Sequence, residues 1–356
     1  MKKLFGFIVV LLALGGILYS QRVAVVTVVL QKALENRFGA DITEDFVDGL
    51  HVALCGAGGP LPAPKASGPC VAVVAGDRLF IVDVGTDSPR NLGRMGMPVG
   101  GVDAVFLTHF HSDHLDGLGE LATLRWAGGN FDAPLPVHGP AGVERIVAGF
   151  NQAYGQDFLY RNAHHGDNVT PLAAAGMTAQ PFDTPANGAL ITLIDEPDLK
   201  VEALAVDHEP VSPAVGYRFT YKGRTALISG DTSKSTNIER FAQGIDLLVH
   251  EALATNIVAM MNAAAERRNL TNLIKITQDI PSYHTSPVEA AEIARDAGVG
   301  HLLYYHIVPP LLLPGQDALF LDGADAIFAN YTIGVDGVAL SLPAGGNEIV
   351  QISNGL

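Results

Sequence analysis

The stretch THFHSDHLDG, residues 108–117, places His109, His111, Asp113 and His114 within six positions. Imidazole and carboxylate groups without thiolate are typical ligands of zinc, iron or manganese. The apolar run DAVFLTH leads into the stretch and a helical pattern follows it, so the motif lies where a strand ends and a helix begins. Strand alternation points His109 and His111 the same way, whereas Asp113 and His114 turn towards a second position. The sequence therefore predicts two adjacent metal sites served by one loop.

Two metal ions need more ligands than this loop supplies, and the remaining candidates each end an apolar strand. His208 ends KVEALAVDH, Asp231 ends RTALISGD and His306 ends HLLYYH. Strand ends gathered at one edge of a sheet are where α/β folds build their sites. We therefore predict His208 and His306 as ligands, and Asp231 as a carboxylate placed to bridge the two ions.

Two further polar groups fit the same edge, namely Glu251, which follows the strand IDLLV and His250, and His284. A glutamate that orients a histidine can keep it protonated, so that the histidine donates a proton to a leaving group. Ser286 and Glu289 form the pattern of a helix capping box just after His284. We interpret His250 as an ordinary strand-end residue and Ser286 as a cap.

Short apolar runs closed by turn residues surround these motifs in two blocks. The predicted strands are HVAL, CVAVVAG, DRLFIVDVG and DAVFLTH in the first block, and KVEALAVDH, AVGYRFTY, RTALISGD, IDLLVHEA and HLLYYH in the second. Alternation of strands and helices in two blocks predicts an α/β protein with two sheets flanked by helices, a four-layer αββα sandwich. Residues 130–195, rich in Ala, Gly and Pro, are predicted to be loops and an accessory insertion. Two interpretations are open for His164 and His165 in this region: they contact substrate, or they lie on a solvated loop.

The N-terminal residues have the pattern of a targeting segment. Lys2 and Lys3 precede an uncharged run that ends at Ser20, as in an export signal; because no convincing cleavage site follows, an uncleaved membrane anchor is the alternative. The predicted organisation is a signal peptide or anchor at 1–20, a helical segment at 21–49 and the main domain at 50–356. The bulk of the chain is thus expected outside the cytoplasm, periplasmic or secreted, with membrane contact only through the N-terminal segment.

The two cysteines, Cys55 and Cys70, flank a Gly/Pro-rich loop, CGAGGPLPAPKASGPC. A disulfide between them would clip this loop, stabilise the fold by about 3 kcal/mol and suit an oxidising compartment. The alternative is a pair of small buried thiols.

The composition describes a core-forming, acidic protein. Hydrophobic residues make up 48% and charged residues 17%, and 37 Asp+Glu against 22 Lys+Arg give a net charge of −15. Because phosphate contacts supply most non-specific nucleic-acid affinity, this balance argues against a nucleic-acid partner.

Together these residues resemble the metallo-β-lactamase superfamily, and within it the branch of ribonuclease Z and the metallo-β-lactamase-type arylsulfatases. The markers, from about Leu50 to about Pro309, are CGAGGP, GPC, LFIVDVG, THFHSDHLDG, DHEPVSPAVGYR, SGDTS, HEA, HTS and the strand-end His306. The resemblance implies the following roles: one metal on His109, His111 and His208, the other on Asp113, His114 and His306, Asp231 bridging, and Glu251 with His284 as the proton donor.

The resemblance also implies a dinuclear zinc hydrolase, with iron or manganese as alternatives, in which the two cations activate a bridging water. Ribonuclease Z carries a long Gly/Pro-rich arm between the GYR and GDT strands, whereas here Arg218 and Asp231 are only thirteen positions apart. The missing arm, the acidic charge and the export signal favour small aryl sulfates or phosphodiesters over tRNA as substrates. The enzyme is expected to be a monomer or a homodimer. The alternatives are a ribonuclease Z-like nuclease, and a lactonase or thioesterase acting on a carbonyl substrate.

Overall fold

The computed structural model describes residues 15, 19–37, 39 and 41–356, and the chain divides into two compact units, Met1–Ile42 and Thr43–Leu356. Most of the predicted targeting segment, residues 1–14 and 16–18, lies outside the described residues. In the first unit, helix α2 (Arg22–Arg37) lies within the segment that was expected to be helical. Of the helices that the model describes, none has the length and apolar character needed to cross a membrane.

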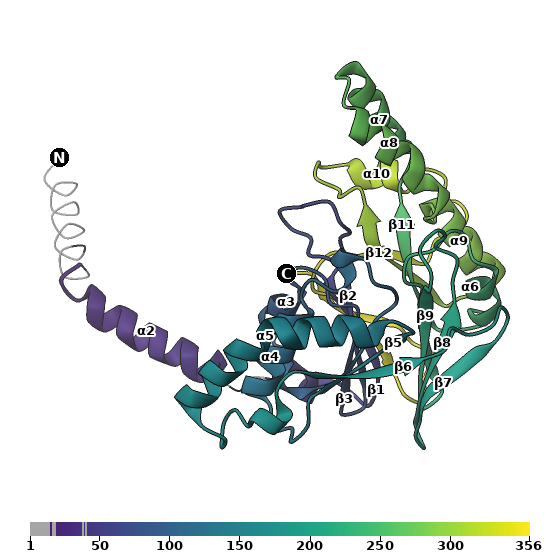
Figure 1. Cartoon of the computed structure of the whole chain (residues 1–356). Coiled ribbons are helices and arrows are strands. Elements are labelled where there is room, and N and C mark those ends of the chain that lie inside the picture. The colour runs from purple at the N-terminus through teal and green to yellow at the C-terminus, as the bar shows by residue number, and fades with distance from the viewer. Residues whose placement is uncertain (1–14, 16–18, 38, 40) are drawn as a thin grey trace, which may run out of the picture. The chain divides into compact units, whose positions relative to one another are not determined.

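The second unit contains two mixed sheets (Figure 1). Among the described residues, the first sheet has eight strands in the order β15-β14-β1-β2-β3-β4-β5-β6, and the second has seven in the order β13-β12-β11-β10-β9-β8-β7. The strands of the first sheet are β1 (Gly49–Gly56), β2 (Cys70–Ala75), β3 (Arg78–Val82), β4 (Val102–Phe106), β5 (Leu135–Pro140), β6 (Met177–Phe182), β14 (Val338–Pro343) and β15 (Val350–Asn354). Those of the second are β7 (Leu190–Asp195), β8 (Leu199–Ala205), β9 (Val215–Tyr221), β10 (Arg224–Ile228), β11 (Leu247–Leu253), β12 (His301–Val308) and β13 (Tyr331–Ile333).

The central strands are buried on both faces, which explains why they read as continuous apolar runs. Between the sheets, Phe106 of one packs against Phe219 of the other with ring centroids 5.6 Å apart. Helices cover the outer faces (Figure 1). Among the described helices, three pack on the first sheet: α3 (Ser88–Arg94), α4 (Leu118–Gly128) and α5 (Val143–His165). Four of the described helices pack on the second: α6 (Thr236–Phe241), α7 (Thr255–Arg267), α9 (Pro287–Asp296) and α10 (Gln316–Phe320). Helix α8 (Thr271–Asp279) packs on α7. The predicted four-layer sandwich is confirmed.

The start of α9 is fixed by the predicted capping box. The Ser286 hydroxyl accepts a hydrogen bond from the Glu289 backbone N–H, and the Glu289 carboxylate accepts one from the Ser286 N–H. Because both first-turn donors are satisfied, the helix begins at a defined residue. This places His284 on a short, well-anchored segment between α8 and α9.

The prediction of loops over residues 130–195 is wrong. This region supplies β5 and β6 to the first sheet, β7 to the second, and the 23-residue helix α5. Both β6 and β7 are edge strands, which bury few side chains and so lack a strong apolar pattern. Helix α5 has few buried residues for its length, and His164 and His165 lie exposed at its C-terminal end. Strands β13, β14 and β15 were not predicted from the sequence.

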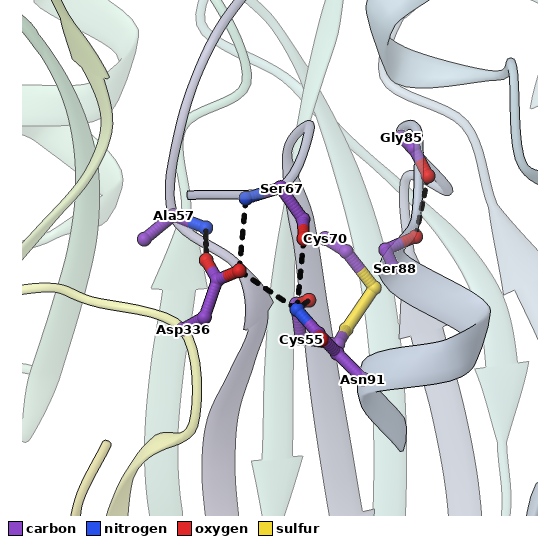
Figure 2. The surroundings of a disulfide bond; sticks show 8 residues. All are labelled: Cys55, Ala57, Ser67, Cys70, Gly85, Ser88, Asn91 and Asp336. Atoms are coloured by element: carbon purple, nitrogen blue, oxygen red, sulfur yellow. Dashed lines mark hydrogen bonds between the residues drawn. A yellow bond between two sulfur atoms is a disulfide. The ribbon is translucent and has the colours of Figure 1, made fainter. Parts of the chain in front are cut away.

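Cys55 and Cys70 form the predicted disulfide at the two ends of the loop that joins β1 to β2 (Figure 2). The carboxylate of Asp336 holds the same loop from the other side. It accepts hydrogen bonds from the backbone N–H groups of Ala57 (2.9 Å) and Ser67 (2.8 Å), and from the Asn91 side chain (2.7 Å). The loop is therefore fixed near both ends by a covalent bond and by a buried carboxylate.

Candidate metal centre

The seven predicted ligands converge at one end of the sandwich although they come from both sheets. His109, His111, Asp113 and His114 follow β4, His208 follows β8, Asp231 follows β10, and His306 lies on β12. Among the described residues, three overlapping groups have their ligand atoms within 4.8 Å of one another: His109, His111, His208 and Asp231 in the first, Asp113, His114 and His306 in the second, and Asp231, His284 and His306 in the third. The first two are referred to below as the first and second groups. The structure thus brings the ligands together in the two sets expected from the sequence.

Asp231 lies between the two groups and is 3% exposed. Its Oδ2 atom is 3.8 Å from His109 Nε2 in the first group and 3.3 Å from His114 Nε2 in the second. Its Oδ1 atom is 3.4 Å from His306 Nε2. A carboxylate in this position can serve both groups.

The chain conformation divides the histidine motif between the groups. Beyond β4 the backbone stays extended at His111 (φ −64°, ψ 147°) and then enters a 3₁₀ turn over Ser112–His114. The extended part directs His109 and His111 to one position, and the turn directs Asp113 and His114 to the other. The four side chains of this loop are therefore divided between the groups as expected from strand alternation.

A bulge in β12 brings His306 to the site. Glu251 pairs with Tyr305 and Ala252 with Ile307, so His306 is an extra residue in the β12 ladder. Its φ of +45° lies in the left-handed region, which is strained for a residue with a side chain. Bulges re-aim side chains at strand ends, and this one explains how a residue of a buried strand reaches the second group.

The carboxylate of Asp83, which was not among the residues predicted from the sequence, supports the second group by a contact to His114. Asp83 accepts hydrogen bonds from the Thr108 backbone N–H and hydroxyl, both at 2.8 Å, and its Oδ2 is 2.8 Å from His114 Nδ1. Because a carboxylate accepts, the proton of the ring lies on Nδ1, which leaves Nε2 with a lone pair facing the group. Asp83 follows the apolar strand RLFIV just as the ligands follow theirs, so the strand-end argument applied to it would have found it.

His208 is oriented in the same manner by a backbone group, since its Nδ1 lies 2.8 Å from the Tyr283 carbonyl oxygen. Burial lowers the pKa of His208 and, more strongly, that of His109. Their rings are therefore neutral near pH 7, and a neutral imidazole is the form that binds metal.

Several buried polar atoms of the two groups have no hydrogen-bond partner among the described residues. They are His114 Nε2, His208 Nε2, His306 Nε2 and Asp231 Oδ1. Buried polar atoms without a partner are costly, and cations bound in the two groups would satisfy these four. These His and Asp side chains can thus hold metal ions, and a donor set without thiolate fits zinc, iron or manganese.

The predicted acid pair lies beside both groups. His284 Nδ1 is 3.0 Å from Glu251 Oε1, and the same oxygen accepts from the backbone N–H of Thr285 (3.0 Å) and of Thr232 (3.2 Å). The His284 ring centroid is 5.1 Å from that of His208 and 5.8 Å from that of His306. The pair therefore stands where a group bound between the two sets would meet it.

The negative charge of Glu251 keeps His284 protonated. Burial opposes protonation of His284, but the Glu251 carboxylate outweighs it and raises the pKa of His284 to about 9. His250 lies outside both groups, and its Nδ1 contacts the Glu251 backbone oxygen. The interpretation of His250 as an ordinary strand-end residue agrees with this contact.

Comparison with known proteins places this arrangement in a family. A family model described as a beta-lactamase superfamily domain matches residues 78–307. The ribonuclease Z of Mycobacterium bovis (strain BCG / Pasteur 1173P2) is 35% identical over 273 residues, which are 75% of this chain and 89% of that protein.

Solved structures show the same fold. Human tRNase Z, short form, covers 82% of this chain and 99% of its own, with a TM-score of 0.57 and 21% identity. The metallo-beta-lactamase fold protein YhfI from Bacillus subtilis covers the same shares with a TM-score of 0.58 and 20% identity. The chain belongs to the metallo-β-lactamase superfamily of hydrolases, in the branch that contains ribonuclease Z.

Proposed function

We propose that this hydrolase is a two-metal phosphodiesterase with a built-in proton donor. The observation that carries the proposal is the Glu251–His284 pair, which lies beside both groups of candidate ligands. A donor of this kind matters most for esters whose leaving oxygen is a poor leaving group, and an unactivated phosphodiester has one. A thioester, whose thiolate leaves readily, has less need of it.

The roles of the side chains follow from their positions. We assign His109, His111 and His208 to one ion, Asp113, His114 and His306 to the other, and Asp231 to both, with zinc as the first metal to test and iron or manganese as alternatives. Two such ions, when bound, supply an acidified water and positive charge for the transition state. His284 gives its proton to the departing oxygen, and Glu251 holds the His284 ring in place.

The choice of phosphorus over sulfur rests on the relatives. The 35% identical protein is a ribonuclease, and a ribonuclease cleaves phosphodiesters. RNA is therefore a substrate to test, against the expectation drawn from the acidic composition. The short connection between β9 and β10, formed by Lys222 and Gly223 alone, favours a smaller diester, because no arm extends there.

We also propose that the protein works outside the cytoplasm. The Cys55–Cys70 disulfide suits an oxidising compartment, and Lys2 and Lys3 before an apolar run suit an export signal or anchor. A fusion to a reporter enzyme that folds only after export tests this, with a matched fusion that starts at Gln21 as the control. Equal reporter activity of both fusions would contradict export.

The test of the activity compares kcat/KM of the zinc-loaded chain for bis(p-nitrophenyl) phosphate, p-nitrophenyl sulfate, a homoserine lactone and a tRNA precursor with a 3′ trailer. The proposal expects the diester to exceed the sulfate and the lactone, with Asp231→Ala, which should lose metal and activity, as the control for contaminating activity. A clear preference for the sulfate or the lactone would refute it. Fast cleavage of the tRNA precursor would extend the activity to RNA.

A further inference from the structure

A cavity of about 1020 Å³ adjoins the second group of candidate ligands. Ser112 and Asp113 line it, and Asp113 is a member of that group. Gly59 of the loop between β1 and β2 also lines it and lies directly against His306, since a Cβ atom added to Gly59 would be 3.0 Å from the ring. A molecule bound at the candidate metal centre can therefore extend into this space.

The walls of the cavity are largely apolar. Two segments rich in Pro and Leu line it, residues 60–64 and residues 310–314, together with Ile307, Ile333 and Val335. Leu312 and Leu313 are 59% and 72% exposed although they are large and hydrophobic. Exposed apolar side chains gathered around a hollow mark a surface that binds an apolar group.

The charges that line the cavity disfavour a polyanion. Four carboxylates, Asp87, Asp113, Asp116 and Asp336, stand against two cations, Lys65 and Arg94. Arg94 is already paired with Asp87 at 2.9 Å. A nucleic-acid chain needs several free cations along its phosphates, and this surface does not offer them.

The acid pair decides which part of a substrate lies here. His284 is not among the residues that line the cavity, so an oxygen that leaves towards His284 departs on another side. The group that remains on phosphorus is then the one that reaches past Asp113. We propose that the cavity binds the non-leaving group of the diester, and that this group is a bulky, uncharged alkyl or aryl group. This inference rests on the proposed phosphodiesterase activity.

The cavity is held ready for such a group. The disulfide and Asp336 fix the loop that carries one wall near both of its ends (Figure 2). A preformed wall loses little conformational entropy when a ligand binds. Affinity should then grow with the apolar area that the ligand buries.

The experiment uses the full, zinc-loaded chain and a series of p-nitrophenyl phosphodiesters whose other substituent is methyl, butyl or octyl. The leaving group is constant, so only the proposed occupant changes. We expect kcat/KM to rise at least tenfold from methyl to octyl. Leu312→Ser and Leu313→Ser should flatten this dependence. Leu159→Ser, which changes a 52% exposed leucine on α5 outside the cavity, should leave it intact.

A binding measurement separates failure of this inference from failure of the activity. Calorimetry should show octyl phosphate binding more tightly than methyl phosphate to the wild-type chain, and the difference should shrink in Leu312→Ser. Turnover of the methyl diester with no gain from chain length would overturn the inference and leave the phosphodiesterase standing. Absence of turnover with every diester would overturn the activity, and equal binding of the two monoesters would overturn the cavity assignment. Preference for p-nitrophenyl thymidine phosphate over the octyl diester would also overturn it.

Discussion

The Nδ1 atom of His284 lies 3.0 Å from Glu251 Oε1, and that one oxygen also accepts from two backbone N–H groups, of Thr232 and Thr285. Three donors on one fully buried oxygen hold the carboxylate in a single orientation. The ring proton on Nδ1 is thereby fixed, and Nε2 is left as the atom that can give a proton to substrate.

Replacing His284 with Ala should lower turnover most for substrates with poor leaving groups. General acids contribute about a hundredfold to ten-thousandfold, and an activated p-nitrophenolate needs little of this help. The loss should therefore be larger for an alkyl diester than for bis(p-nitrophenyl) phosphate, with the metal content of the protein unchanged. An equal loss for every leaving group would exclude the donor role.

The pH dependence of kcat/KM should show the same group on its alkaline side. The carboxylate of Glu251 raises the pKa of His284 to about 9, so the protonated, donating form is present at neutral pH and disappears as the pH rises through this value. Bound cations favour the neutral ring and move the decline to lower pH. Glu251→Gln removes the stabilising charge and should shift the decline further down, and His284→Ala should abolish it for poor leaving groups.

Asp231→Ala should lose metal as well as activity. Asp231 is the residue within 4 Å of ring nitrogens from both groups, so its removal leaves the mutually close histidine rings without a shared anion. Elemental analysis after gel filtration should find less than two equivalents of metal. Two ions at full occupancy would show that Asp231 is not the bridge.

Asp83→Asn should weaken metal binding without removing a ligand. An amide can present its NH₂ group to His114 Nδ1 and so disturb the tautomer that points a lone pair at the site. Changes of this kind typically reduce metal affinity about tenfold to a hundredfold. Competition with a chromophoric chelator measures the effect, and Asp103→Asn, which alters an ion pair with Arg78 instead, is the matched control.

Removing the disulfide with the double change Cys55→Ala and Cys70→Ala should lower the free energy of unfolding by about 3 kcal/mol. In a chain of this size that corresponds to a fall in Tm of several degrees. Thermal unfolding of oxidised wild type and variant measures it. Detection of two free thiols in unreduced, denatured wild type would contradict the bond itself.

The residues of the candidate metal centre could be found from the sequence because most of them follow a strand that is mainly apolar. The end of such a strand is visible from local pattern alone, as at Asp231 and His208. The same approach failed where burial is slight, as in β6 and β7, and where the partner is distant, as in β14, which pairs with β1. The position of Asp83 at the end of an apolar strand was visible in the sequence. Its role as the partner of His114, 31 positions away, was not, because that proximity exists only after β3 and β4 pair.

The candidate ligands are divided between the sheets, and neither sheet has a complete set. The four residues of the histidine motif follow β4 of the eight-stranded sheet, whereas His208, Asp231 and His306 come from the seven-stranded one. Metal ions bound there would cross-link the two sheets of the sandwich. Metal binding would then require that both sheets have assembled. A chelator would weaken the contact between the sheets before it unfolded either one.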